Sequence, residues 1–174
     1  MQKTIKYITF ETTWGYFGLA GTEFALLRTY LPLPDPEKVK SQLLTDLGNP
    51  QYDSSLFKTL QQQITAYFEG ACVNFSPDIP ILLNGLSYFA CSVLMACRGI
   101  KFGQTMSYGQ LAHKVGRPKA ARAIGRIMAN NPLPLIIPCH RVIRSDGKVG
   151  GFSATGSPDL KKKMLKLERQ ALRT

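Results

Sequence analysis

The chain has 174 residues, of which 44% are hydrophobic, and its formal net charge is +11. This length allows one ordinary domain or two small ones, and the apolar fraction is sufficient for a packed core. The four cysteines include no C-x-x-C pair and are accompanied by two histidines, which argues against a structural zinc site and a disulfide framework. We therefore expect no metal and, since the N-terminus lacks an apolar signal core, a reducing, cytoplasmic location.

The charge is unevenly distributed along the chain. Residues 1–97 carry 6 basic and 8 acidic side chains, a balance of −2, whereas residues 98–174 carry 16 basic and 3 acidic side chains, a balance of +13. A concentrated positive field attracts polyanions and speeds their encounter with the protein. Nucleic acid is the favoured partner, and a solvated basic surface or a membrane-surface patch is the alternative that charge leaves open.

Residues 4–31 are predicted to form strands. Residues 4–10 (TIKYITF) are rich in β-branched and aromatic types, and residues 26–31 (LLRTYL) have the composition of a returning strand. A short helix is predicted over residues 37–47. A clearer one is predicted over residues 54–69, where apolar side chains recur on one stripe before a glycine.

A linker is indicated at residues 76–80, which contain two prolines, so the predicted domains are residues 1–79 and 80–174. Residues 80–97 contain no charged side chain and are nearly long enough to span a membrane. Because polar residues interrupt this stretch, we predict a buried helix over residues 87–98. Insertion into a membrane is the alternative.

The rest of the basic half is predicted to be mainly helical. Ser107 is a suitable N-cap for a helix over residues 108–115, and a second helix is predicted over residues 119–129 after a glycine-containing turn. Two short helices joined in this way indicate a helix-turn-helix motif. A final amphipathic helix is predicted to begin at Ser157-Pro158.

The second helix of this motif is rich in small residues around a single arginine. Ala121, Ala123 and Gly125 would allow its backbone to approach another surface closely, and Arg122 projects from among them. Helix–helix packing uses small residues in the same way. With sixteen basic residues in this half of the chain, DNA binding is the better interpretation.

The segment 136–142 (IIPCHRV) places a cysteine between a short apolar run and two basic side chains. A cysteine acts as a nucleophile through its thiolate, which cationic neighbours favour. Adjacent side chains of an extended chain point to opposite faces, so His140 needs a tight turn or a bridging water to reach Cys139. A structural cysteine beside a core histidine is the alternative, but Pro134 and Pro138 bracket the segment and stiffen it.

A histidine base usually needs an acceptor that orients it. Glu168 is the sole glutamate after residue 69, and the other two acids of the basic half are Asp146 and Asp159. Glu168 lies next to the apolar stripe of the last helix and could face inward. A surface pair with the lysines of residues 161–166 is equally compatible with its position.

Three segments together resemble the 6-O-alkylguanine-DNA alkyltransferases, or methylated-DNA–protein-cysteine methyltransferases. They are residues 131–142 (NPLPLIIPCHRV), 100–108 (IKFGQTMSY) and 118–123 (PKAARA). The resemblance covers residues 86–174 strongly and the N-terminal strands weakly. It implies a small α/β N-terminal domain with an antiparallel sheet. A mainly helical C-terminal domain with a winged-helix-like helix-turn-helix core would follow.

The resemblance also implies a mechanism. Cys139 would accept the alkyl group, and His140, held by Glu168, would deprotonate it through a water. Asn131 would brace the active-site turn, and Tyr108 would interact with the purine ring nitrogen. Transfer to sulfur leaves a thioether with no group that is easily expelled, so each molecule would act once and without a cofactor.

Further roles follow for the DNA-binding helix and for the pocket. Arg122 would fill the space left by a nucleotide rotated out of the duplex, with the helix in the minor groove. Arg126 stands where many members have a small residue. The substrate pocket would include Pro134, Phe152, which replaces a common tyrosine, and Ser153, next to a segment over residues 154–158 that is longer than usual.

The expected partner is double-stranded DNA containing alkylated guanine, bound by a monomer. Two other classes of function compete with this reading. One is a non-catalytic lesion sensor or helix-turn-helix regulator, but sensor-type relatives lack the acceptor cysteine. The other is a cysteine hydrolase or a redox thiol enzyme, which would turn over on an ester or a disulfide, and the sequence offers no obvious resolving cysteine.

Overall fold

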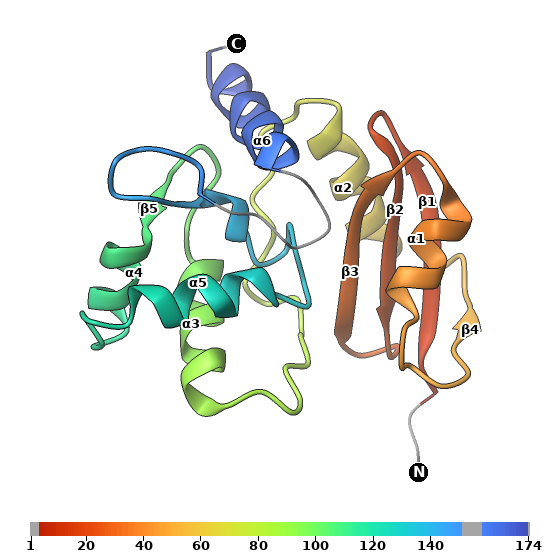
Figure 1. Ribbon diagram of the computed structural model, residues 1–174. Coiled ribbons are helices and arrows are strands. Elements are labelled where there is room, and N and C mark those ends of the chain that lie inside the picture. Colours follow the sequence, from red (N-terminus) through yellow and green to blue (C-terminus); the bar gives the residue numbers. More distant parts are fainter. Residues whose placement is uncertain (1–3, 151–157, 174) are drawn as a thin grey trace. The chain divides into compact units, whose positions relative to one another are not determined.

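A computed structural model describes residues 4–150 and 158–173 of the chain. The chain divides into two compact units, Met1–Leu82 and Leu83–Thr174 (Figure 1). The predicted boundary after residue 79 lies three residues earlier. Residues 80–82 belong to the first unit because the amide of Leu26 donates to Pro80 O at 2.9 Å and the amide of Leu82 donates to Leu26 O at 2.7 Å.

The first unit is built on a four-stranded sheet in the order β3-β2-β1-β4. Its strands are β1 (Lys6–Thr12), β2 (Gly15–Gly21), β3 (Leu26–Leu33) and the two-residue β4 (Gln51–Tyr52). The first three strands pair antiparallel, as expected, whereas β4 pairs parallel to β1. The sheet is therefore mixed. The parallel pairing is possible because a helix lies between β3 and β4 in the chain and carries it across to the free edge of β1.

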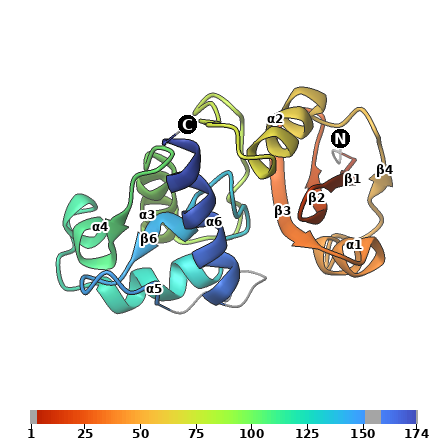
Figure 2. The same cartoon turned by 90° about the horizontal axis from the view of Figure 1, so that it is seen from above.

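Helices α1 (Pro36–Leu43) and α2 (Lys58–Phe68) cover opposite faces of this sheet (Figure 2). Successive residues of β2 point to opposite faces. The Gly18 side faces Leu43 of α1, while the ring of Phe17 lies 6.0 Å from that of Phe68 in α2. A Cβ at Gly18 would lie 3.0 Å from side-chain atoms of Val39 and Leu43, so this glycine favours the close approach of helix and sheet.

Both helices are shorter than the sequence pattern predicts. The first was expected to continue to residue 47 but ends at Leu43, before turns that place Asp46 at a φ of 61°. The second was expected from residue 54 but begins at Lys58, because Phe57 adopts a left-handed conformation with a φ of 51°. Local turn conformations, which helical periodicity does not encode, account for both differences.

The second unit is mainly helical, as the sequence predicts. Its helices are α3 (Tyr88–Arg98), α4 (Tyr108–Lys114), α5 (Ala121–Ala129) and α6 (Pro158–Ala171). The strands β5 (Met106–Ser107) and β6 (Val142–Ile143) form a small parallel pair. No helix among the described residues is long and apolar enough to cross a membrane.

Helices α4 and α5 form the predicted helix-turn-helix and pack against α3. A capping box begins α4: the Ser107 hydroxyl accepts from the Gln110 amide, and the Gln110 side chain accepts from the Ser107 amide. The next helix begins at Ala121 rather than at residue 119, because residues 117–120 form a turn in which the Ala120 amide donates to Arg117 O.

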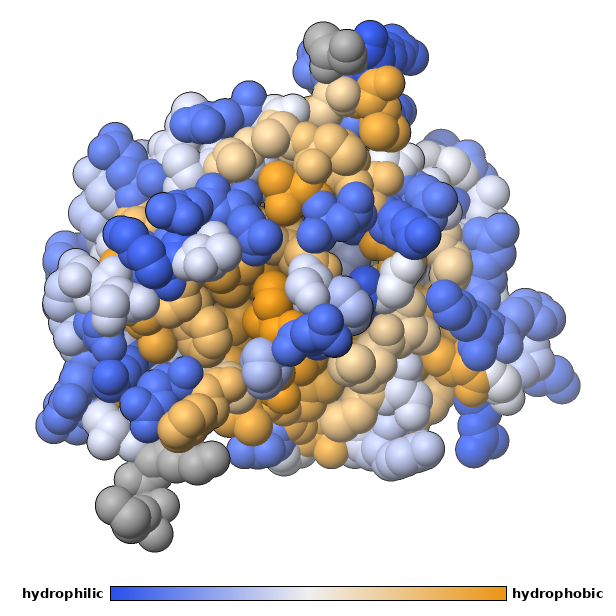
Figure 3. Space-filling view, turned by 180° about the vertical axis from the view of Figure 1, so that it is seen from behind, coloured by the Kyte–Doolittle hydropathy of each residue, from blue (hydrophilic) through white to orange (hydrophobic). Residues whose placement is uncertain are grey.

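Several large apolar side chains remain exposed in the two units. They are Phe24, Tyr52, Leu86, Tyr88, Met95 and Leu172. Figure 3 shows apolar surface between hydrophilic side chains on one face of the molecule. Isolated exposed apolar residues are normal in soluble proteins and do not by themselves mark an interface.

Candidate active site

The cysteine of the IIPCHRV segment begins a single turn of 3₁₀ helix, Cys139–Arg141, between Pro138 and β6. Asn131 fixes the chain before this turn, because its side-chain Nδ2 donates to Ile137 O at 2.8 Å and its Oδ1 accepts from the Leu133 amide at 3.0 Å. The backbone is strained nearby: Leu135 has a φ of 76°, which non-glycine residues rarely adopt. The turn is therefore imposed by its surroundings.

Cys139 is 1% exposed, and burial raises the pKa of its thiol above the ordinary value. A hydrogen bond from Asn131 and the charge of Lys161 act in the opposite direction. The sequence predicts a thiol ionised by its cationic neighbours. In the structure, desolvation is the larger effect, so the free protein holds Cys139 as a thiol and a base is needed to remove its proton.

The next side chain, His140, is paired with Glu168. Its Nε2 lies 2.7 Å from Glu168 Oε1, and both side chains are buried. Burial lowers the pKa of His140, so the imidazole is neutral. A neutral ring bonded to a carboxylate carries its proton on Nε2, which leaves Nδ1 as the nitrogen able to accept a proton.

Glu168 faces inward, so its position resolves the two alternatives that the sequence leaves open. Burial would raise the pKa of this carboxyl, but the hydrogen bonds from His140 and Arg141 and the charge of Arg141 lower it to about 2. The glutamate is thus a carboxylate at neutral pH. An ionised acceptor of this kind is suited to orient a histidine base.

Arg141 was not singled out from the sequence, yet it makes more hydrogen bonds to Glu168 than His140 does. Its Nε lies 3.1 Å from both carboxylate oxygens, its Nη2 donates to Oε1 at 2.9 Å, and its Nη1 donates to Ile100 O at 2.7 Å. The amide of Gly103 donates to Oε2 at 2.9 Å. Gly103 has a φ of 72°, a conformation that favours glycine, so the IKFG segment also supports the glutamate.

Lys161 is the second buried cation that the sequence analysis missed. The residue is 1% exposed, and its Nζ donates to Val142 O at 2.6 Å and to the Tyr108 hydroxyl at 3.4 Å. The signal in the sequence is its spacing: Lys161, Met164 and Glu168 share one face of α6, and these are the buried residues of that helix. The run of lysines over residues 161–166 instead suggests a solvated position for it.

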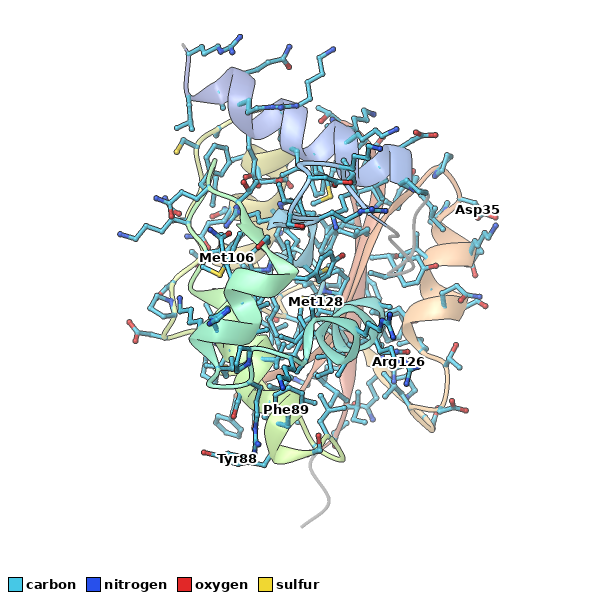
Figure 4. All side chains as sticks on the ribbon, turned by 60° about the vertical axis from the view of Figure 1, so that its left-hand side comes forward. Asp35, Tyr88, Phe89, Met106, Arg126 and Met128 are labelled. Atoms are coloured by element: carbon cyan, nitrogen blue, oxygen red, sulfur yellow. The ribbon has the colours of Figure 1, made fainter. Side chains whose placement is uncertain are left out.

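The predicted DNA-binding residues lie on α5 as expected from its helical spacing. Arg122, Ala123 and Arg126 are exposed, and Ala121 and Gly125 are half-buried. Figure 4 shows Arg126 and Met128 on different sides of α5, and Met128 is buried in the core. The exposed face, hereafter the α5 face, therefore consists of Arg122, Ala123 and Arg126.

Of the three predicted pocket residues, Pro134 is the one that lies within the described part of the chain. Pro134 is buried beside the Cys139 turn and forms a bridge with Ile137. Phe152 and Ser153 lie outside the described residues, as does most of the longer segment over residues 154–158. Within residues 4–150 and 158–173, no three His, Cys, Asp or Glu side chains gather as metal ligands would.

The second unit combines a helix-turn-helix, the type of helix pair that many DNA-binding proteins have, with a buried cysteine, histidine and glutamate. The fold and the site therefore define a DNA-binding class of protein with a candidate cysteine nucleophile. Residues 88–170 match the family described as the 6-O-methylguanine DNA methyltransferase DNA binding domain. A methylated-DNA–protein-cysteine methyltransferase of Mycolicibacterium paratuberculosis is 37% identical over 167 residues, an alignment that covers 95% of this chain and 93% of the relative. The chain belongs to the methylated-DNA–protein-cysteine methyltransferase family.

Two further comparisons agree with this assignment. A methylated-DNA–protein-cysteine methyltransferase of Methanosarcina acetivorans is 35% identical, with 93% of this chain and 97% of the relative covered. The crystal structure of Mycobacterium tuberculosis OGT in complex with DNA superposes with a TM-score of 0.80 at 32% identity, over 95% of this chain and 94% of that chain. Both units of the fold are therefore shared with relatives.

Proposed function

We propose that this protein repairs DNA by transferring the alkyl group of 6-O-alkylguanine to the sulfur of Cys139, once per molecule. The observation that carries the proposal is the buried turn in which Cys139 precedes a histidine paired with Glu168, in a chain that aligns along nearly its whole length with methyltransferases of this name. The acceptor cysteine argues against a purely lesion-sensing role.

In the proposed reaction the damaged nucleotide rotates out of the duplex, since its alkyl group cannot be reached inside the base stack. His140 takes the thiol proton, by way of a water, and Glu168 stabilises the imidazolium that results. The thiolate attacks the alkyl carbon, and the bond from that carbon to the guanine oxygen breaks. The product is a thioether, which the site has no means of reversing.

The departing guanine gains an electron pair and needs a proton. We assign its donation to the Tyr108 hydroxyl, which lies at the start of α4 and is half-buried. Burial raises the pKa of this phenol. Asn131, which braces the turn, acts by holding Cys139 in line with its target. Each step uses side chains of this chain, and no cofactor enters it.

We assign DNA binding to the α5 face, which would lie in the minor groove with Arg122 filling the gap left by the rotated nucleotide. The surplus of positive charge in residues 98–174 supports binding to a polyanion. We place the monomer in the cytoplasm, acting on chromosomal DNA, with Pro134, Phe152 and Ser153 at the pocket.

The test is to mix the protein with a duplex that carries 6-O-methylguanine and to measure its intact mass. We expect a gain of one methylene per chain, mapped to the peptide of Cys139 and abolished by Cys139→Ser. A protein that binds the duplex but gains no mass would instead be a lesion sensor. Repeated turnover on an ester or disulfide would favour a thiol enzyme.

A further inference from the structure

The exposed side of α6 carries basic side chains that the reaction described above does not use. Of the 16 basic residues in the range 98–174, five are exposed on α6 or in the turn after it, and five are exposed in the helix-turn-helix. The first group consists of Lys162, Lys163, Lys166, Arg169 and Arg173, and the second of Lys114, Arg117, Lys119, Arg122 and Arg126. Much of the positive charge of the second unit is thus divided between two groups of equal size.

Helical spacing aligns three of these side chains along α6. Lys162, Lys166 and Arg169 follow one another at intervals of four and three residues, so they lie on one side of the helix. The buried residues of the helix lie on another side. We refer to these three basic residues as the α6 stripe. At 1.5 Å per residue the stripe is about 10 Å long, which matches about three nucleotides of one DNA strand.

The α6 stripe lacks the acidic partners that would balance its charge. Glu168, which its position in the sequence would allow to pair with these lysines, is turned inward and bonded to Arg141. Lys162 lies 3.7 Å from Asp159, but Lys166 and Arg169 form no ion pair within the described residues. Like charges three or four residues apart on a helix repel each other. A polyanion laid along the stripe would relieve this repulsion.

A cavity of about 220 Å³ adjoins the α6 stripe. Lys162 and Arg169 are among its lining residues, and the chain over residues 143–149 forms its other side. Glu168 also lines it, but its carboxylate is already bonded to Arg141. Lysine and arginine form strong, charge-assisted hydrogen bonds to phosphate oxygens. The cavity therefore offers a phosphate group a place between two cations of the stripe.

The α6 stripe and the α5 face lie on different parts of the second unit. Helix α6 packs mainly against the 3₁₀ turn, whereas α5 packs against α3 and α4. Figures 1 and 4 both show α6 along one end of this unit, apart from the α4–α5 pair. The two basic surfaces are therefore available to different segments of DNA.

An anionic lipid surface presents the same phosphate chemistry, but α6 does not have the apolar face that binding to it requires. A helix that lies in a membrane interface buries an apolar face among the lipids. In α6 the apolar side chains face the protein: Met164 is buried, and Leu160, Leu165 and Leu167 are half-buried. The stripe is therefore suited to the phosphates of a nucleic acid rather than to a membrane.

Building on the assignment of a first duplex to the α5 face, we propose that the α6 stripe is a second DNA-binding surface. It holds a separate duplex segment by its phosphates, without reading its sequence. Lys162, Lys166 and Arg169 contact phosphates of one strand, and the adjoining cavity receives one of them. Such a surface lets the protein pass from one DNA segment to another without first being released into solvent.

The test measures how fast the protein leaves a fluorescent, undamaged duplex when unlabelled duplex is added in excess. For the wild type, the release rate should rise in proportion to the concentration of unlabelled duplex, because the stripe binds the incoming duplex before the first one leaves. For Lys166→Gln/Arg169→Gln, the rate should not depend on that concentration. The concentration-dependent rate of the wild type should fall with salt with a log–log slope of about −3, one unit for each phosphate contact.

The matched control is Lys38→Gln/Lys58→Gln, which removes two exposed charges from the first unit. This variant should keep the wild-type dependence on unlabelled duplex, because the total charge alone does not create the second surface. Circular dichroism and a melting curve for each variant establish that it is folded. Binding to vesicles that contain phosphatidylserine is measured in parallel for all three proteins.

A wild-type release rate that does not change with unlabelled duplex would overturn the proposal, and this result needs no variant to fold. So would an equal dependence in Lys166→Gln/Arg169→Gln, or a loss of its affinity for the first duplex alone, which would place both surfaces on one duplex. Vesicle binding that requires the stripe, with no effect of unlabelled duplex, would assign it to a lipid surface. Failure of the proposed function is a different result, in which Cys139 gains no mass although duplexes still exchange.

Discussion

The basic side chains around the Cys139 turn and those of the α5 face belong to the same unit but lie in opposite environments. Arg141 and Lys161 are buried and bonded to named partners, together with His140 and Glu168; we refer to these four residues as the buried cluster. Arg122 and Arg126 are exposed. The same excess of positive charge therefore serves two purposes.

Net charge alone therefore does not distinguish the buried cations of the candidate active site from the exposed ones. A buried charge must be paired, so removing one member of the buried cluster leaves its partner uncompensated. An exposed arginine is solvated in the free protein, so we expect its removal to weaken DNA binding and to leave the fold intact. Substitutions in the two regions should thus separate loss of stability from loss of DNA recognition.

The largest effect is expected for Glu168→Gln in the buried cluster. The variant leaves Arg141 without a carboxylate and His140 without the acceptor that orients it, so the free energy of unfolding should fall by about 3 to 5 kcal/mol. Transfer to Cys139 should slow by roughly 100-fold or more, even where the variant remains folded. Urea unfolding and single-turnover transfer at low temperature measure the two effects.

The acid limb of the wild-type stability curve gives an independent check on this variant. The pKa of Glu168 is lowered from 4.5 to about 2 in the folded protein, so its contribution is complete above pH 4.5 and is lost as pH falls toward 2. A shift of this size corresponds to about 3 kcal/mol. Asp159→Asn, at an exposed position of α6, should still lose this stability as pH falls from 4.5 toward 2. Glu168→Gln should not show this acid-dependent loss. Equal acid sensitivity in both variants would show that Glu168 does not cause this loss of stability.

A smaller effect, confined to DNA, is expected for Arg122→Ala on the α5 face. If the guanidinium fills the gap left by the rotated nucleotide, transfer from duplex should slow by about 10-fold or more, in line with the few kcal/mol that extrusion costs. Transfer from the free base 6-O-methylguanine and the unfolding midpoint should stay unchanged. Equal slowing with both substrates would show that Arg122 has no part in extrusion.

Sequence patterns located these two regions unequally well. The helix-turn-helix and the exposure of Arg122 follow from local spacing, and the IIPCHRV segment identifies its own cysteine and histidine. The partners of Glu168 could not be derived in that way, because Arg141 and Gly103 reach it from other parts of the chain. The burial of Lys161 could not be predicted either, because a lysine within a run of lysines suggests a solvated surface.

The smallest effect is expected for Arg126→Ala. Arg126 follows Arg122 by one helical turn on the α5 face, so it should contribute to binding without contributing to extrusion. Affinity for undamaged duplex should weaken by a few-fold, and the dependence of log affinity on log salt concentration should become shallower by about one unit. Lys58→Ala, at an exposed position in the first unit, is the matched control and should leave the salt dependence unaltered. If Arg126→Ala slowed transfer as much as Arg122→Ala, the two arginines would share one role. Both would then contribute to extrusion of the nucleotide, instead of Arg122 contributing to extrusion and Arg126 to binding alone.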